Sequence, residues 1–198
     1  MVDINTPICF AWKRAGSISA ALAFCLFAAS PTQAQSVRDA RTSHSATATP
    51  GQGFSLQYGY HSKYQRFGLA YETPPLWTYP FENSGRLDLS VELGAGYWKA
   101  DRRDPDSMWQ VAVVPVVRWW PGDTYYFELG VGPSLLSRAH FAGKELSTRF
   151  QFTSHIGGGI VVDEVHRFGL RYTHVSNASI KTPNPGLDLI EASYTYQF

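Results

Sequence analysis

The chain has 198 residues, a formal net charge of +1, 17 glycines and 15% aromatic residues. This length suits a single domain. The nearly balanced charge gives no reason to expect a nucleic acid as a partner.

The first 34 residues have the pattern of a cleaved signal peptide. Lys13 and Arg14 form a basic region, and the apolar run ISAALAFCLFAA follows over residues 18–29. This run is too short to cross a membrane comfortably as a helix. Small residues precede a suitable cleavage point before Gln35, so we expect export with removal of residues 1–34.

Beyond this segment, no stretch is long and apolar enough for a transmembrane helix. Polar and apolar residues instead alternate in runs of about ten residues, which is typical of a transmembrane β-barrel. Leu87, Leu89 and Val91, for example, are separated by Asp88 and Ser90. The expected strands are 53–61, 67–76, 85–99, 108–120, 125–136, 148–162, 167–178 and 186–198.

The alternation alone does not separate a membrane barrel from a soluble β-sandwich, whose apolar face would be the interior. Three features favour the barrel. One is the export signal, and another is the C-terminal segment SYTYQF, which resembles the assembly signal of bacterial outer-membrane barrels. The third is a set of aromatic residues near strand ends, as in interface girdles: Trp98, Trp109, Trp119, Trp120, Tyr125 and Tyr126.

We therefore expect an all-β fold, an eight-stranded antiparallel transmembrane β-barrel in the bacterial outer membrane. The expected organisation is a cleaved signal peptide (1–34), a flexible N-terminal lead-in (35–52) and the barrel domain (53–198).

With the N-terminus in the periplasm, the segments 121–124 and 163–166 become short periplasmic connections, and 77–84 is a longer one. The interior of a barrel of this size is filled with side chains, so an open pore is not expected. The following charged residues are expected to pair inside: Arg86, Asp88, Glu92, Arg118, Glu128, Arg149, Arg171 and Glu191.

The last hairpin breaks the hydrophobic pattern of the outer face. Phe168, Leu170 and Tyr172 share that face, and His174 and Ser176 continue it. An imidazole and a hydroxyl thus point outward near the extracellular end, where lipid contacts are expected.

The opposing strand places an acid beside them. If the hairpin is symmetric about Lys181, Asp188 lies directly across from His174, with Cβ atoms about 5 Å apart. The same register sets Glu191 opposite Arg171 inside the barrel.

An acid beside a histidine beside a serine is the arrangement needed for nucleophilic acyl transfer. The alternative is that His174 and Ser176 are polar girdle residues and Asp188 is a loop acid. Ionisable groups on a lipid-facing surface are costly, which favours a function.

The segment RYTHVSNASIKTPNPGLD (171–188) resembles the signature of the lipid A 3-O-deacylases, outer-membrane esterases with an eight-stranded barrel. Weaker similarity extends over most of residues 85–198. The residues that match the signature are His174, Ser176, Asn177, Ala178, Lys181, Pro183, Asn184, Gly186 and Asp188.

The resemblance implies hydrolysis of the ester-linked hydroxyacyl chain at the 3-position of lipid A, without metal or cofactor. It implies that Ser176 is the nucleophile, His174 the general base and Asp188 the orienting acid. Asn177 and Asn184 are oxyanion-hole candidates by the same resemblance, or else they shape the turn.

Two departures from the family pattern concern the site. Asp188 stands where several members carry glutamate, which is longer by one methylene. Ser179 stands where glycine is common.

The expected partner is lipid A in the outer leaflet, whose acyl chains would lie along the apolar wall. Lys181 either attracts a lipid phosphate or is simply solvated. The oligomeric state stays open, a homodimer being one alternative. Two other functions also stay open, a non-enzymatic small barrel and another lipid-modifying barrel such as a phospholipase or an acyltransferase.

Overall fold

The computed structural model describes residues 51–198 apart from 83–84 and 102–103. The expected signal peptide (1–34) and all but the end of the expected lead-in (35–52) lie outside the described residues. Within the described ranges, no helix is long and apolar enough to cross a membrane.

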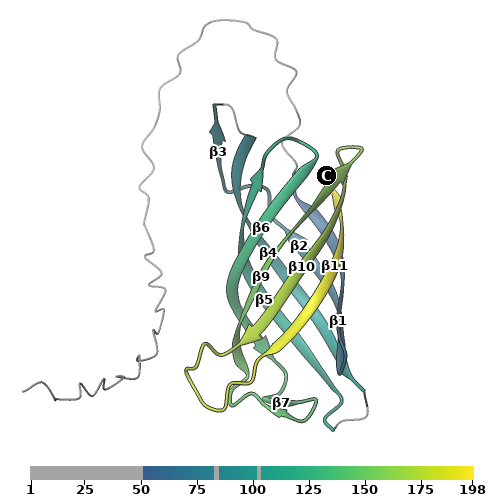
Figure 1. The fold of residues 1–198 in the computed structure, drawn as a ribbon, viewed down its shortest axis with the longest axis vertical. Helices are drawn as coiled ribbons and strands as arrows, with labels where there is room; N and C mark the ends of the chain where they lie inside the picture. The colour runs from purple at the N-terminus through teal and green to yellow at the C-terminus, as the bar shows by residue number, and fades with distance from the viewer. Residues whose placement is uncertain (1–50, 83–84, 102–103) are drawn as a thin grey trace, which may run out of the picture. The chain divides into compact units, whose positions relative to one another are not determined.

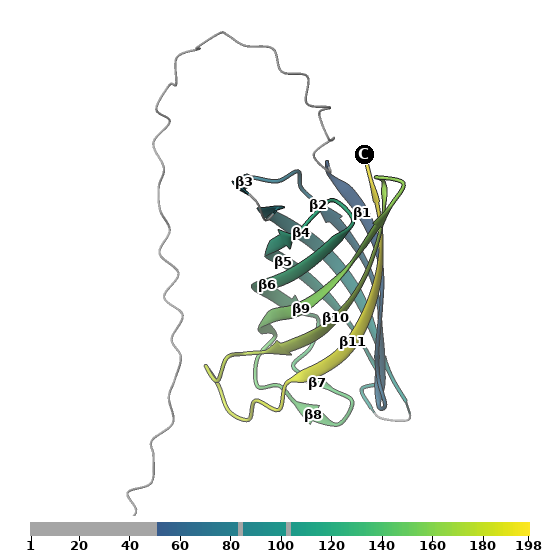
Figure 2. The same cartoon turned by 45° about the horizontal axis from the view of Figure 1, so that its top comes forward.

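Eight long strands form a closed antiparallel barrel (Figures 1 and 2). Each of them pairs with the next, and β11 pairs with β1 to close the ring. The expected fold is confirmed. The barrel strands are β1 (Gly53–His61), β2 (Tyr64–Glu72), β4 (Gly85–Ala100), β5 (Ser107–Trp120), β6 (Tyr125–Leu136), β9 (Phe150–Val162), β10 (His166–Ser176) and β11 (Leu187–Gln197).

Three short strands lie at the ends of the barrel. β3 (Trp77–Phe81) pairs with the beginning of β4, and β7 (His140–Phe141) pairs with β8 (Lys144–Glu145). The β7–β8 hairpin lies at the end opposite the C-terminus (Figure 1). In an outer-membrane barrel the terminus-bearing end is periplasmic, so this hairpin is extracellular.

Two expectations about the second strand and the connection that follows it were wrong. β2 covers Tyr64–Glu72 rather than 67–76, because only Ser62 and Lys63 separate it from β1. The segment 77–84, expected to be a plain connection, contains β3. Its alternating residues pair with the first residues of β4 and extend that edge of the sheet.

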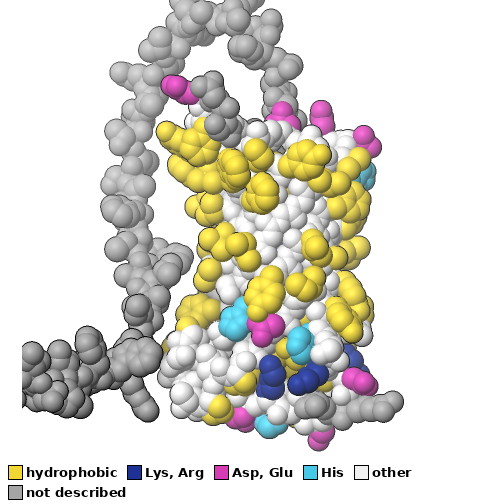
Figure 3. Space-filling view, in the orientation of Figure 1, with side chains coloured by type: hydrophobic (Ala, Val, Ile, Leu, Met, Phe, Trp, Pro, Cys, Tyr) yellow, Lys and Arg dark blue, Asp and Glu magenta, His cyan; other side chains and the backbone are white. Residues whose placement is uncertain are grey.

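The outer wall of the barrel is apolar. Leu129, Ile156 and Leu170 are 54%, 62% and 61% exposed. Figure 3 shows hydrophobic side chains covering much of the visible wall, with most charged side chains above and below them. A continuous apolar surface of this extent suits a lipid environment.

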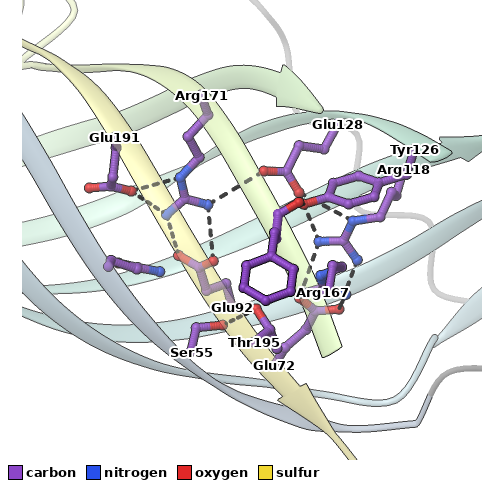
Figure 4. Close-up of polar contacts among 12 residues, drawn as sticks. Ser55, Glu72, Glu92, Arg118, Tyr126, Glu128, Arg167, Arg171, Glu191 and Thr195 are labelled. Carbon is purple, nitrogen blue, oxygen red and sulfur yellow. Dashed lines mark hydrogen bonds and ion pairs between the residues drawn. The ribbon is translucent and has the colours of Figure 1, made fainter. Parts of the chain in front are cut away.

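The middle of the barrel interior holds a network of buried ion pairs (Figure 4). Arg171 Nε donates to Glu191 Oε1 at 2.7 Å, and its two terminal nitrogens contact Glu92 at 3.1 and 3.2 Å. Arg66 Nη1 reaches the other oxygen of Glu191 at 2.7 Å. Such charges are tolerated away from water because each is paired and hydrogen-bonded. The expected pairing of Arg171 with Glu191 is confirmed.

Arg149 does not join this network, contrary to expectation. It precedes β9 and is exposed, and its Nε donates to the Leu136 carbonyl oxygen at 2.9 Å. The alternation of β9 does not extend back to this residue, so it does not fix the side to which Arg149 points.

The expectation of aromatic girdles was wrong for three of the six residues. Trp98, Trp120 and Tyr126 are 0%, 1% and 2% exposed and lie inside the barrel. They occupy inward positions of their strands, and Trp98 Nε1 donates to Gln110 Oε1 at 2.9 Å. Trp109 and Tyr125, each 61% exposed, do face outward.

An apolar plug fills the extracellular end of the interior. Phe141 of the β7–β8 hairpin packs there against Tyr64 and Trp98, with ring centroids 5.8 and 6.1 Å apart. Because the plug includes residues of β10 and β11, it fixes the end of the last hairpin. Its members are Tyr64, Trp98, Ala100, Met108, Leu136, Phe141, Ala142, Leu146, Val175, Leu187 and Leu189.

Candidate active site

The β10–β11 hairpin carries the predicted catalytic residues on its outer face. His174 and Asp188 are directly opposed, which confirms the predicted register. Val175 follows His174 and Leu187 precedes Asp188. Both point inward into the plug and are 1% and 0% exposed. Because side chains alternate along a strand, anchoring these two residues turns His174 and Asp188 outward.

Two side chains hold Asp188 through the same carboxylate oxygen. His174 Nδ1 lies 2.7 Å from Asp188 Oδ1, and the Tyr172 hydroxyl donates to the same oxygen at 2.5 Å. The Asp188 backbone N–H donates to the Tyr64 hydroxyl at 3.1 Å. An ionised carboxylate only accepts hydrogen bonds, so the contact between His174 and Asp188 favours the histidine tautomer with its hydrogen on Nδ1. This tautomer leaves Nε2 of His174 as a base.

Ser176 is the last residue of β10, two positions beyond His174 on the same face, and it is half-buried. Two residues along a strand correspond to roughly 7 Å between Cα atoms, within reach of two side chains. No hydrogen bond joins Ser176 to His174 among the described contacts. Catalytic hydrogen bonds are often long in the free enzyme and shorten when substrate binds.

Gly186 lies against the imidazole of His174. Its φ is +62°, and a Cβ atom at this position would lie 2.6 Å from His174 Cε1. Only glycine therefore lets the loop backbone approach the ring so closely. Lys144 Nζ donates to the Gly186 carbonyl oxygen at 2.7 Å and ties the β7–β8 hairpin to this contact.

Asn177 and Asn184 have different environments. Asn177 is 0% exposed, and its Nδ2 donates to the carbonyl oxygens of Leu146 and Lys181, both at 3.0 Å. Its backbone N–H donates to Asn184 Oδ1 at 3.1 Å. The Asn177 side chain is thus engaged in shaping the loop, whereas Asn184 has its oxygen fixed and its Nδ2 hydrogens unused by the described residues.

The next two residues have left-handed backbone conformations. Ala178 and Ser179 have φ values of 52° and 63°. Their N–H groups make no hydrogen bond to any described residue. A left-handed backbone is adopted most easily by glycine, yet Ala178 and Ser179 adopt it here despite their Cβ atoms.

Lys144 brings a positive charge close to Asp188. Burial lowers the pKa of its ammonium group, Asp188 raises it, and the neighbouring Lys63 lowers it further. The site therefore has a partly desolvated cation beside the loop that contacts His174.

Sequence reasoning missed three contributors to this site. Tyr172 had a signal, because it precedes His174 by two positions on the same outward face. Tyr64 and Lys144 had none, because they come from distant segments that only the closed barrel brings to Asp188 and Gly186.

His155 lies away from the site. It points into the lumen and is 3% exposed, and neither ring nitrogen has a hydrogen-bond partner among the described residues. Among all the residues that the structure describes, no group of three or more His, Cys, Asp or Glu side chains could hold a metal ion.

The sequence model of the family described as lipid A 3-O-deacylase (PagL) matches residues 64–197. The chain belongs to this family. A PagL-family relative from Bordetella bronchiseptica, named lipid A deacylase PagL, is 51% identical over 156 residues, which cover 77% of this chain and 88% of the relative. The relative of the same name from Pseudomonas aeruginosa is 26% identical over 132 residues, covering 65% and 75% of the two chains.

A solved structure agrees on the fold of the PagL family. The crystal structure of the outer membrane enzyme PagL superposes with a TM-score of 0.64 at 22% identity, covering 74% of this chain and 99% of that one. The superposition supports the barrel fold. The family membership makes the chain an ester hydrolase, and the membrane barrel with its apolar outer wall belongs to the bacterial outer membrane.

Proposed function

We propose that this chain hydrolyses the ester-linked acyl chain at the 3-position of lipid A, with Ser176 as nucleophile, His174 as general base and Asp188 as orienting acid. The observation that carries the proposal is the 2.7 Å contact between His174 Nδ1 and Asp188 Oδ1 on the lipid-facing wall, one outward position from Ser176. The family membership and the names of both relatives support the substrate.

The location suits a lipid substrate. The triad lies at the extracellular margin of the apolar wall, and in Figure 3 a histidine and an acidic side chain lie side by side at the lower edge of the hydrophobic surface. A glycolipid of the outer leaflet would place its acyl chains on that wall and its sugar beyond it. The ester between chain and sugar then falls at the level of Ser176.

The reaction follows from these groups. Ser176 Oγ attacks the ester carbonyl while His174 Nε2 takes its proton, and the Asp188 carboxylate stabilises the resulting imidazolium. His174 then donates the proton to the departing sugar hydroxyl. Water, activated by the same imidazole, cleaves the acyl-enzyme and releases the fatty acid and free Ser176.

The oxyanion formed in each step needs donors near Ser176. We assign Asn184 Nδ2 to this role together with the backbone N–H groups of Ala178 and Ser179, whose hydrogens are unused by the described residues. Asn177 acts indirectly here, because its backbone N–H holds Asn184 Oδ1 at 3.1 Å.

The test is to incubate the purified protein with lipopolysaccharide and to identify the released acid by mass spectrometry. We expect a free 3-hydroxy fatty acid from wild type and none from Ser176→Ala. Equal release by that variant would refute the assignment. Transfer of the acyl chain to an added hydroxyl acceptor, without free acid, would indicate an acyltransferase, and loss of activity on calcium chelation would indicate a phospholipase-type enzyme.

A further inference from the structure

A group of basic side chains lies beside the triad, at the extracellular ends of β1 and β2. Lys63 occupies the β1–β2 turn, His61 ends β1, and Lys144 reaches over from the β7–β8 hairpin. In Figure 3 dark-blue and cyan side chains gather at this end, below the hydrophobic surface.

The ring of Tyr64 organises this group. The His61 ring stacks on it with centroids 4.4 Å apart and an interplanar angle of 16°, and Lys144 Nζ lies 5.8 Å from its centroid. The Tyr64 hydroxyl accepts the Asp188 backbone N–H at 3.1 Å. His61, Lys144 and Asp188 therefore all lie around the same side chain.

The positive charge of the group comes from Lys63 and Lys144, and Asp188 offsets part of it. Within the described residues, neither Lys63 nor Lys144 forms an ion pair with an acidic side chain, and the two ammonium groups repel each other. Lys99, on the same rim, differs because it is paired with Asp106. Lys144 is partly desolvated and Lys63 is exposed, and two neighbouring ammonium groups of this kind are suited to a phosphate.

We propose that Lys63, His61 and Lys144 form a subsite for a phosphate group on the sugar of the glycolipid substrate. The inference rests on the proposed function. The inference extends the proposed function by placing the phosphosugar on the β1–β2 side of the triad. Lys144 holds Gly186, which contacts His174, so a phosphate bound here lies next to the catalytic loop.

Lys181 is the alternative anchor, on the 177–186 loop. Its backbone serves that loop, and its exposed side chain has no recorded contact with the described residues. Lys63 is exposed as well, but its charge acts on Lys144, which lies over the Tyr64 ring, so we assign the phosphate to Lys63 and Lys144.

The experiment measures acyl release from lipid A and from its dephosphorylated counterpart in mixed micelles. Wild type is expected to have a KM about tenfold lower for the phosphorylated substrate, the size of one charge-assisted hydrogen bond. In Lys63→Ala the two KM values are expected to converge, and in Lys63→Glu the preference is expected to reverse.

Lys99→Ala and Lys181→Ala are the matched controls, and both should keep the wild-type preference. Heat-dependent gel mobility checks that every variant is folded. Equal KM values in wild type, a preference that survives in Lys63→Ala, or one lost in Lys181→Ala would each overturn the subsite. Absence of acyl release from both substrates would instead refute the proposed function, and the subsite with it.

Inorganic phosphate separates a headgroup subsite from a site for free phosphate. A headgroup subsite predicts that millimolar phosphate raises KM for the phosphorylated substrate and leaves KM for the dephosphorylated one unchanged. An equal effect on both substrates would assign the group to free phosphate and overturn the proposal.

Discussion

The Tyr172 hydroxyl donates to Asp188 Oδ1 at 2.5 Å, the same oxygen that faces His174 Nδ1. Aspartate is shorter than glutamate by one methylene, so its carboxylate has less reach toward the ring. A second donor on the shared oxygen fixes the shorter carboxylate at the distance that the imidazole needs.

Tyr172→Phe should therefore lower kcat about tenfold, since a hydrogen bond to a charged group contributes roughly 1.5 kcal/mol. The measurement is the initial rate of fatty acid release at saturating lipopolysaccharide. Tyr125→Phe is the control, because Tyr125 is 61% exposed at the periplasmic end. An unchanged kcat in Tyr172→Phe would show that the phenol does not position Asp188.

Gly186→Ala should lower kcat/KM about a hundredfold, the effect expected when a catalytic group is displaced by about 1 Å. The new Cβ would lie 2.6 Å from His174 Cε1, and the φ of +62° disfavours alanine. Gly122→Ala is the matched control, because a Cβ atom there meets nothing within 4 Å. Equal activity of the two variants would contradict the role assigned to Gly186.

Glu191→Gln should destabilise the barrel by roughly 3–5 kcal/mol, because it removes the acidic partner of buried Arg66 and one of the acidic partners of buried Arg171. The free energy of unfolding can be followed in urea by the gel-mobility shift between folded and unfolded barrel. Asp123→Asn breaks the exposed ion pair with Arg86 and should change this free energy by less than about 1 kcal/mol. A similar effect of both substitutions would argue against the importance of the interior network.

The mature protein should begin at Gln35. The basic region, the apolar run and the small residues before this position are those of a cleaved signal peptide. Mass spectrometry of the protein purified from outer membranes would show this N-terminus. Retention of residues 1–34 would contradict the expected processing.

Local alternation carried most of the correct predictions from sequence. Because strand side chains alternate faces, the pattern alone placed Leu170 outward and Arg171 inward. The symmetry of the last hairpin then set His174 opposite Asp188, as the structure has it.

Alternation fails where the strand ends, as at Arg149 just outside β9. The girdle expectation failed for a different reason, because it took Trp98 by its place near a strand end, although alternation puts Trp98 on the inner face. The plug could not be predicted, since its members come from seven segments that meet only when the barrel closes.

The site was predictable only where its residues share one hairpin. Tyr64 and Lys144 reach Asp188 and Gly186 across long sequence separations. The different roles proposed for Asn177 and Asn184 depend on which side-chain amide hydrogens already bond within the loop. The spacing of the residues in the sequence does not indicate this.

The central claim is that Ser176 is a nucleophile activated on the lipid-facing wall. Its most direct test is reaction of the folded barrel with a long-chain fluorophosphonate, followed by peptide mass mapping. The account predicts a single adduct on Ser176, formed much more slowly in His174→Ala and Asp188→Asn. An adduct on another residue, or labelling of Ser176 that is unaffected by those two substitutions, would contradict it.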